Sequence, residues 1–205
     1  MVADRLAARH FTAQDALPDD VEAVELRRLN SFLRGLLLLD GTVSRALEAE
    51  TLHPVEIEAV AQEEREPPAA ESAALGLSGG ERCIRRRVEM RIASATPSVW
   101  AESYVVPERL PETFLNALTG NTQGIGGSLQ QLHLESAREL LWFGLATPPP
   151  WSASAGAPAG TLRRAYLIIT GGQPALLITE DFALQENSGV LSLAGQGRET
   201  APRSQ

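Results

Sequence analysis

The sequence has few of the side chains that form disulfides and metal sites. Its 205 residues include one cysteine, Cys83, and three histidines, His10, His53 and His133. A single cysteine excludes an internal disulfide and a thiolate metal cluster, and the histidines lack the spacing of metal ligands. We therefore expect no bound metal, and the scarcity of cysteine fits a reducing, cytoplasmic environment.

Positive charge and long apolar runs are also scarce. The chain has 18 Lys and Arg residues against 26 Asp and Glu residues, a formal net charge of −8. This balance argues against a surface for nucleic acid or anionic membranes, because both need clustered basic side chains. The leucine run at 36–39 is too short to span a bilayer, and residues 1–15 lack the apolar core of a signal peptide. We expect a cytoplasmic protein with neither nucleic-acid nor membrane partners, in which any site for an anion is built locally.

What is present is the composition of a folded domain. Hydrophobic residues make up 43% and charged residues 21% of the chain, an ordinary globular mixture. A chain of 205 residues suits one domain with a substantial core. We expect a flexible arm at 1–18, a single domain at 19–184 and a flexible polar tail at 185–205.

The spacing of apolar residues predicts two helices near the start of the domain. Apolar side chains three and four residues apart predict a long helix that begins at Asp19 or Asp20 and ends at Gly41. A second, shorter helix is expected at 42–50, with Thr42 as its N-cap. Together they form a helix–turn–helix pair.

Strands dominate the rest of the chain. Alternating patterns predict strands at 53–62, 83–93 and 99–107, a short helix at 110–118, and a hairpin at 164–182 with a two-glycine turn. The other segments are expected as loops (62–80, 119–128 and 147–160) and as a short helix leading into a strand (129–146). Early helices and late hairpins predict an α+β domain with a mainly antiparallel sheet.

One predicted strand, "PALLITEDFAL" at 174–184, carries a carboxylate on its apolar face. Side chains on a strand alternate between its two faces. One face therefore presents Leu176, Ile178, Glu180, Phe182 and Leu184. An ionised carboxylate among such side chains is costly unless it is paired. Glu180 therefore needs an explanation.

A second strand, "CIRRRVEMRIA" at 83–93, carries an arginine in the same kind of position. One face presents Ile84, Arg86, Val88, Met90 and Ile92, and the other face is expected to be solvated. An arginine stays charged, so Arg86 must meet an anion or reach water. Arg86 and Glu180 could form a buried salt bridge, each could lie near a wet strand end, or both could line a ligand cavity. The pattern leaves these three alternatives open.

Several segments, taken in order, resemble the chorismate pyruvate-lyase (chorismate lyase) family over roughly residues 28–184. The family makes 4-hydroxybenzoate and pyruvate from chorismate. The matching segments are "LLLLDGTVSRALE", "RRVEM", "AESYVVP", "TQGIGG", "RELLWFG" and "QPALLITEDF". The resemblance implies an antiparallel sheet flanked by helices, with the ligand buried under helix–turn–helix lids.

The resemblance also implies roles for individual residues. Arg86 matches the arginine that binds the ring carboxylate, and Ile125 matches the loop position whose backbone N–H reaches the same carboxylate. Glu180 matches the glutamate near the ring hydroxyl, with a catalytic role in moving a proton or in orienting that hydroxyl. Val43 falls where the lid touches the ligand. Arg138 is our candidate for the second carboxylate of chorismate, the alternative being a surface arginine.

The chemistry implied by the family requires no cofactor, because forming an aromatic ring supplies the driving force. The protein must position the substrate, exclude water and help one proton to move. The same fold type serves as a sensing domain in bacterial regulators. A non-catalytic domain that binds aromatic carboxylates, or a related lyase of secondary metabolism, is therefore the alternative expectation.

Overall fold

The structure is a computed structural model that describes residues 2–92, 97–120, 124–152 and 160–194. The strands are β1 (Val55–Arg65), β2 (Cys83–Ile92), β3 (Pro97–Val105), β4 (Ala137–Ala146), β5 (Thr161–Thr170), β6 (Gln173–Asn187) and β7 (Val190–Leu193). The helices are α1 (Val2–His10), α2 (Ser31–Leu37), α3 (Val43–Thr51), α4 (Ala69–Ala74), α5 (Glu112–Gly120) and α6 (Ile125–Gln131), with 3-10 turns η1 (Leu26–Arg28) and η2 (Pro107–Arg109).

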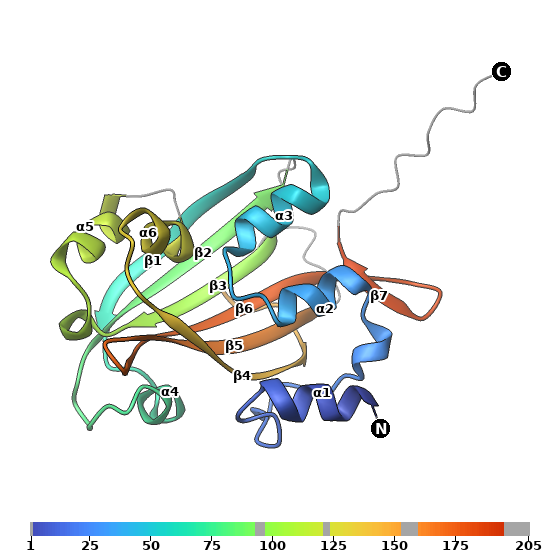
Figure 1. Ribbon diagram of the computed structural model, residues 1–205, viewed down its shortest axis with the longest axis horizontal. Helices are drawn as coiled ribbons and strands as arrows, with labels where there is room; N and C mark the ends of the chain where they lie inside the picture. The colour runs from blue at the N-terminus through green and yellow to red at the C-terminus, as the bar shows by residue number, and fades with distance from the viewer. Residues whose placement is uncertain (1, 93–96, 121–123, 153–159, 195–205) are drawn as a thin grey trace.

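A single antiparallel sheet organises the molecule (Figure 1). Its strand order is β1-β2-β3-β6-β5-β4, and β7 pairs with the far end of β6. The expected hairpin is β5 and β6, which turn at Gly171 and Gly172 with φ angles of 56° and 79°. These are left-handed values that glycine adopts without strain. The expected mainly antiparallel α+β fold is confirmed.

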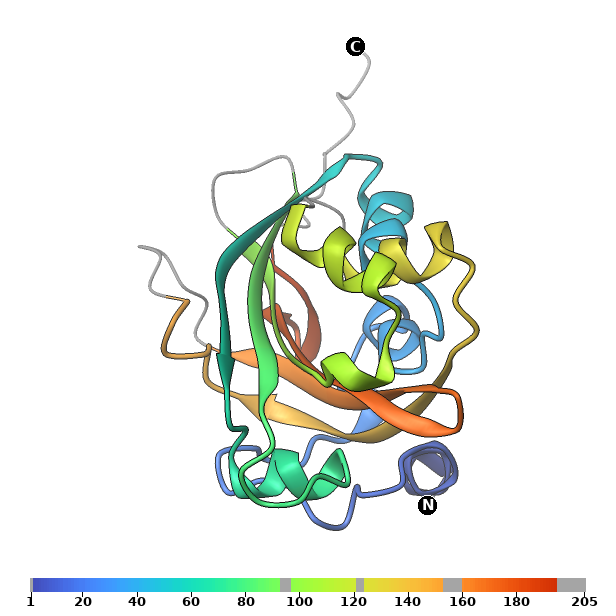
Figure 2. The ribbon, with the colours of Figure 1, turned by 90° about the vertical axis from the view of Figure 1, so that its left-hand side faces the viewer.

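The sheet curves, and its two faces are covered by different helices. Helices α2, α3, α5 and α6 lie together inside the curve, whereas α4 lies on the opposite side (Figure 2). Packing agrees with this view: Leu75, at the end of α4, belongs to a buried cluster with Tyr104 and Leu177 of the outer face. We call the side that carries α2, α3, α5 and α6 the inner face.

Two apolar clusters fill the inner face. The first joins α2 and α3 to the ends of β2, β3, β5 and β6, through residues such as Leu33, Leu37 and Phe182. The second joins α5 and α6 to the other ends of β3, β5 and β6, through residues such as Phe114 and Ile178. The space between these clusters is where the candidate site lies.

The first helix of the domain is shorter than its apolar spacing predicts. It begins at Ser31, because the backbone before it forms the short turn η1 and bonds to strands on either side of that turn. Glu22 exchanges two hydrogen bonds with Leu145 of β4, at 2.8 and 2.7 Å, and the N–H of Asn30 donates to Leu191 at 2.9 Å. The Asn30 side chain then caps α2. The second helix begins after Thr42 as expected, although the Thr42 hydroxyl makes no capping bond.

Two segments expected as loops contain regular structure. In the segment 62–80, β1 continues to Arg65, which pairs with Cys83, and helix α4 follows. In the segment 119–128, helix α6 already begins at Ile125. Glycine is a poor helix former, so the packing of α6 against its neighbours, rather than local propensity, holds this first turn. Residues 153–159 of the expected connection at 147–160 lie outside the described residues.

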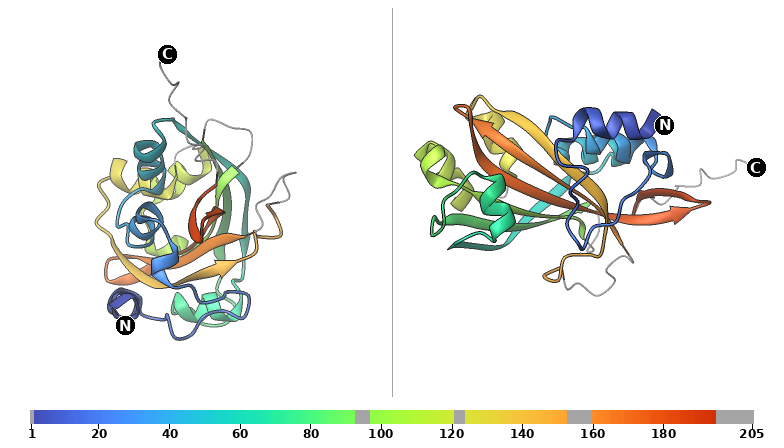
Figure 3. Two further views of the ribbon diagram at one scale, coloured as in Figure 1. Left: turned by 90° about the vertical axis from the view of Figure 1, so that its right-hand side faces the viewer. Right: turned by 90° about the horizontal axis from the view of Figure 1, so that it is seen from below.

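Regular structure also occurs in segments for which we expected a flexible arm and tail. Helix α1 is followed by Phe11, which is buried and packs on Phe143 with ring centroids 4.7 Å apart. The next residues run along the free edge of β4 (Figure 3), where the N–H of Thr12 donates to Leu140. At the other end, Leu191 of β7 is buried as a member of the first cluster. Burial of these apolar side chains provides hydrophobic stabilisation, which a purely polar tail would lack. Residues 195–205 lie outside the described part of the chain.

Candidate functional site

A cavity lies on the inner face between the two apolar clusters. Its free interior is about 40 Å³, and it is open to solvent on one side. Its walls come from six strands of the sheet, β1 to β6, from the turn before α3 and from the start of α6. The apolar lining residues are Val43, Ile57, Val88, Met90, Ala101, Ile125 and Ile178.

All five candidate residues line this one cavity: Arg86, Glu180, Ile125, Val43 and Arg138. Arg86 comes from β2, Glu180 from β6 and Arg138 from β4, while Val43 and Ile125 are the first residues of α3 and α6. Segments that are distant in the sequence therefore meet at a single point.

Strand register explains why Arg86 and Glu180 share the inner face. Arg86 lies opposite Ser103 of β3, and Glu180 lies opposite Ala101 of the same strand. The two residues are therefore one row apart on the same face, with β3 between them, and both lie in the cavity wall. Both are nearly fully buried, with 2% of Arg86 and 3% of Glu180 exposed.

Glu180 forms its ion pair with Arg164. The Nε of Arg164 donates to Oε2 of Glu180 at 2.7 Å, and the Tyr166 hydroxyl donates to Oε1 at 3.2 Å. Of the three alternatives left by the sequence, this arrangement disfavours a strand end open to water, because both partners are buried. It also gives Glu180 an arginine other than Arg86 as its partner.

Sequence reasoning missed Arg164 and Tyr166, although a signal was present. The segment "TLRRAYLIIT" alternates so that Leu162, Arg164, Tyr166 and Ile168 share one face. Arg164 thus has the same anomaly as Arg86, a lone charge on an apolar strand face. Its position opposite Glu180 depends on the register between β5 and β6, which the sequence of one strand alone does not determine.

Arg138 is a cavity residue and not a surface arginine. Only 13% of its side chain is exposed, and its guanidinium lies over the Tyr166 ring, 5.6 Å from the centroid. Its Nη1 donates to Oδ1 of Asp40 at 3.2 Å, and 80% of the Asp40 side chain is exposed. Ion pairs of an exposed carboxylate contribute little free energy, so a ligand carboxylate can replace Asp40 on Arg138 at small cost.

The two segments that cover the cavity touch each other. A Cβ atom added to Gly126 would lie 3.1 Å from the Thr42 hydroxyl oxygen and 3.5 Å from Thr42 Cα. Glycine at 126 therefore lets the start of α6 pack closely against the turn before α3. The Thr42 hydroxyl is buried and makes no hydrogen bond within the described ranges, so it is available to a ligand. We call residues 40–43 and 124–127 the two lid segments.

The cavity has polar groups of both signs. Burial lowers the pKa of the Arg86 guanidinium, which nevertheless stays charged at neutral pH. Burial, followed by the neighbouring Glu180 charge, raises the pKa of the Tyr166 phenol. With Arg86 and Arg138 in its wall, the cavity offers two cations to an anionic ligand, while Glu180 is held by Arg164 and Tyr166.

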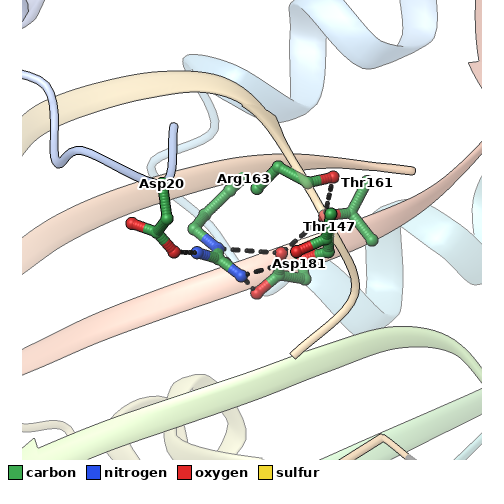
Figure 4. A network of polar contacts seen from close by, with 6 residues as sticks. Asp20, Thr147, Thr161, Arg163 and Asp181 are labelled. Atoms are coloured by element: carbon green, nitrogen blue, oxygen red, sulfur yellow. Dashed lines mark hydrogen bonds and ion pairs between the residues drawn. The ribbon is translucent and has the colours of Figure 1, made fainter. Parts of the chain in front are cut away.

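The outer face carries a second arginine–carboxylate pair, in which Asp181 is buried and Arg163 is partly exposed. Arg163 contacts both oxygens of Asp181, at 2.9 and 3.1 Å, and also bonds to Asp20 and to the carbonyl of Thr147 (Figure 4). Thr161 donates to Asp181 at 2.6 Å. Burial raises the pKa of the Asp181 carboxyl, and Arg163 and Thr161 oppose that shift. Strand parity places this network away from the cavity.

The described residues contain neither a cluster of metal-ligating side chains nor a membrane-spanning helix. Among residues 2–92, 97–120, 124–152 and 160–194, no three His, Cys, Asp or Glu side chains gather in a way that could hold a metal ion. No helix in the same ranges is long and apolar enough to cross a membrane.

Solved structures share this fold. The effector domain of PhnF from Mycobacterium smegmatis matches 70% of this chain and 88% of its own chain, with a TM-score of 0.55 and 11% sequence identity. The structure of PhnF from the same organism matches 71% of this chain and 65% of its own, with a TM-score of 0.55 and 12% identity. At this level of identity the likeness concerns the fold alone.

Sequence comparisons show the family. The chorismate pyruvate-lyase of Mycobacterium tuberculosis (strain H37Rv) is 30% identical over 164 residues, which cover 77% of this chain and 82% of that protein. The chorismate pyruvate-lyase of Mycobacterium leprae is 28% identical over 166 residues, covering 77% of each chain. The family model described as "Chorismate pyruvate-lyase Rv2949c-like" matches residues 37–188, from the end of α2 through β6. The chain therefore belongs to the Rv2949c-like chorismate pyruvate-lyase family.

Proposed function

We propose that this protein converts chorismate into 4-hydroxybenzoate and pyruvate. The observation that carries the proposal is that Arg86 and Glu180, from different strands, line the same largely apolar cavity beneath the lid segments. A buried arginine suits the ring carboxylate, and a buried carboxylate one row away suits the ring position that bears the hydroxyl. Family membership supports the same chemistry.

The reaction is an elimination that balances without any other reactant. The C–H bond at the ring carbon that bears the hydroxyl breaks, and its electrons complete the aromatic ring. The ether C–O bond beside it breaks, and that electron pair leaves with the enolpyruvyl oxygen. A proton then returns to the enolpyruvate carbon to give pyruvate. Because no atom is oxidised by an outside acceptor, we infer that the reaction needs no redox cofactor.

The cavity residues divide the recognition of a dianion between them. Arg86 binds the ring carboxylate with two parallel N–H donors, and the backbone N–H of Ile125 assists, since first-turn N–H groups of a helix have no intrahelical acceptor. Arg138 takes the enolpyruvyl carboxylate by releasing the exposed Asp40. Val43 packs on the ring from the lid segment at 40–43.

Glu180 acts at the reacting carbons. Its Oε2 is held by Arg164, whereas Oε1 accepts from the hydroxyl of Tyr166, which lines the cavity together with Glu180. We propose that this carboxylate accepts a hydrogen bond from the ring hydroxyl or takes the departing ring proton. Exclusion of water by the lid segments strengthens each of these polar contacts.

A direct assay tests the proposal. Purified protein is incubated with chorismate of verified purity, in the presence of a chelator, and the products are separated by chromatography. Equal amounts of 4-hydroxybenzoate and pyruvate are expected. Absence of both would contradict the lyase proposal, and tight binding of 4-hydroxybenzoate without turnover would support a domain that only binds aromatic carboxylates.

A further inference from the structure

Two consecutive arginines of β5 face two consecutive carboxylates of β6. The register places Arg163 opposite Asp181 and Arg164 opposite Glu180. Because side chains alternate, the first pair lies on the outer face and the second on the inner face. The same two strands thus carry two arginine–carboxylate pairs, a fully buried one that borders the cavity and a partly exposed one on the outer face.

Arg164 connects Glu180 to the helix that precedes a lid segment. Its side chain has no exposed surface. Besides its bond to Glu180, its Nη1 donates to the backbone carbonyl of Leu36 and to that of Leu37 at 3.2 Å. These carbonyls belong to the last turn of α2, just before the segment 40–43. One guanidinium therefore holds the carboxylate of β6 and the end of α2 together.

Stability alone gives a poor reason for this pair. A buried ion pair can often be replaced by apolar residues without loss, because removing two charges from water is costly. The Nη2 of Arg164 is buried without a hydrogen bond within the described part of the chain, which adds to that cost. Leu162 and Phe182, in the adjacent row, show that the inner face accepts apolar pairs.

The position of Arg164 relative to the cavity suggests its role. Glu180 and Tyr166 line the cavity, whereas Arg164, among the described residues, is not part of the lining. Its guanidinium lies 4.9 Å from the centroid of the Tyr166 ring, so its plane is fixed by stacking as well as by hydrogen bonds. It bonds to Oε2 of Glu180, whereas Oε1 accepts from Tyr166, a residue of the cavity lining.

We propose that Arg164 is a positioning residue for the reaction, and this rests on the proposed lyase function. It fixes Oε2 of the Glu180 carboxylate and leaves Oε1 to act on the substrate. Through Leu36 and Leu37 it also sets the end of α2, and with it the lid segment at 40–43. Arg164 touches no substrate atom and acts through Glu180.

The experiment compares turnover in Arg164→Met, Glu180→Gln and the double variant with that of the wild type. For Arg164→Met we expect kcat to fall by about 100-fold, the effect of a misplaced catalytic group. KM for chorismate changes little, because Arg86 still binds the carboxylate. In the double variant kcat is no lower than in Glu180→Gln alone, because both substitutions disable the same group.

Arg163→Met is the matched control. It breaks the equivalent pair on the outer face, so it lowers the melting temperature and leaves kcat unchanged. If Arg164→Met fails to fold, Arg164→Lys carries the test, since it keeps the charge. An ammonium cannot reproduce the guanidinium fork that reaches Glu180 and both carbonyls, and kcat is expected to fall by about 10- to 100-fold.

The outcomes separate this proposal from the proposed function. A wild-type protein without turnover contradicts the lyase function and this assignment with it. An active wild type with a folded Arg164→Met or Arg164→Lys variant at full kcat contradicts the positioning role alone. A double variant whose kcat falls by the product of the two single effects also contradicts it, because independent structural damage combines in that way.

Discussion

Arg86 and Arg87 are neighbours in the sequence with different surroundings. Arg86 is 2% exposed and lines the cavity. Arg87 lies on the outer face, where it pairs with Glu102 and stacks on Trp151 at 5.2 Å from the ring centroid. Strand parity can therefore be tested at these two positions. Truncation of Arg86 should affect ligand affinity, and the same truncation of Arg87 should affect stability.

The first prediction therefore concerns ligand affinity. Arg86→Ala should weaken 4-hydroxybenzoate binding by about 2–5 kcal/mol, the effect of removing one partner of a buried charge pair. Arg87→Ala should leave the affinity unchanged and cost some stability. Calorimetric titration of both variants measures this. Equal losses of affinity, or a larger loss for Arg87→Ala, would show that the wrong arginine has been assigned.

The second prediction concerns Glu180. Glu180→Gln keeps the shape of the side chain, and its amide oxygen can still accept from Arg164, but the charge is lost. If the carboxylate moves a proton, turnover should fall by about 10²–10⁴-fold, while 4-hydroxybenzoate still binds through Arg86. Steady-state kinetics and calorimetry measure the two effects. A folded variant that binds product and turns over at the wild-type rate would remove Glu180 from the mechanism.

Asp181→Asn is the control for that experiment, and the structure refines what it should do. Asp181 lies on the outer face, as parity predicts, but it is buried and bonded to Arg163 and Thr161. The substitution is therefore not silent. We expect it to lower the free energy of unfolding by about 1–3 kcal/mol and to leave turnover per folded molecule unchanged.

At the scale of elements, strand periodicity was a better guide than helix periodicity. Parity alone identified Arg86 and Glu180 as anomalies, because a charge on an apolar strand face is unusual wherever the strand pairs. The helix expected to begin at Asp19 or Asp20 begins only at Ser31, because the backbone near Glu22 and Asn30 bonds to distant strands. The partner of Glu180 was missed for a related reason, since register between strands depends on the whole sheet.

The third prediction concerns the lid segments. Thr42 and Gly126 are in close contact, so the segments 40–43 and 124–127 should open and close together. Saturating 4-hydroxybenzoate should slow amide hydrogen exchange in both segments, because the bound state holds them closed. Mass spectrometry of peptides from each segment, with α4 peptides as an internal control, measures this. Slowing in neither segment would contradict a lid role.

At the scale of the whole molecule, the two faces of the sheet differ: one carries the cavity and the other carries structural contacts. The inner face carries the cavity, with Arg86, Arg138 and Glu180 in its wall. The outer face carries the network around Arg163 and the apolar cluster under α4. Variants of the outer face should thus report on stability, and variants of the inner face on ligand binding and turnover.

The last prediction concerns stability at high pH, where the composition gives an unusually simple case. The chain contains no lysine, one cysteine and two tyrosines. Burial raises the pKa of Cys83 to about 11 and that of Tyr104 to about 12, and it raises that of Tyr166 as well. Arginine stays protonated at these pH values. In the unfolded chain these three side chains ionise between about pH 9 and 11, whereas in the folded protein their raised pKa values keep them neutral to higher pH.

The sign of the effect follows from the direction of the shifts. A group whose pKa is higher in the folded state contributes stability that is fully present below its unfolded pKa and is lost as pH rises through the folded one. For Cys83 that window runs from the ordinary value of 9.0 to about 11, and the loss by pH 11 is about 2 kcal/mol. Urea unfolding at pH 8, 9, 10 and 11 should show a steady decline in the free energy of unfolding. Cys83→Ala should be less stable at pH 8 but decline less steeply, because only the tyrosines remain to ionise. A Cys83→Ala variant with the same slope as the wild type would show that the thiol stays neutral through unfolding or reaches water in the folded protein.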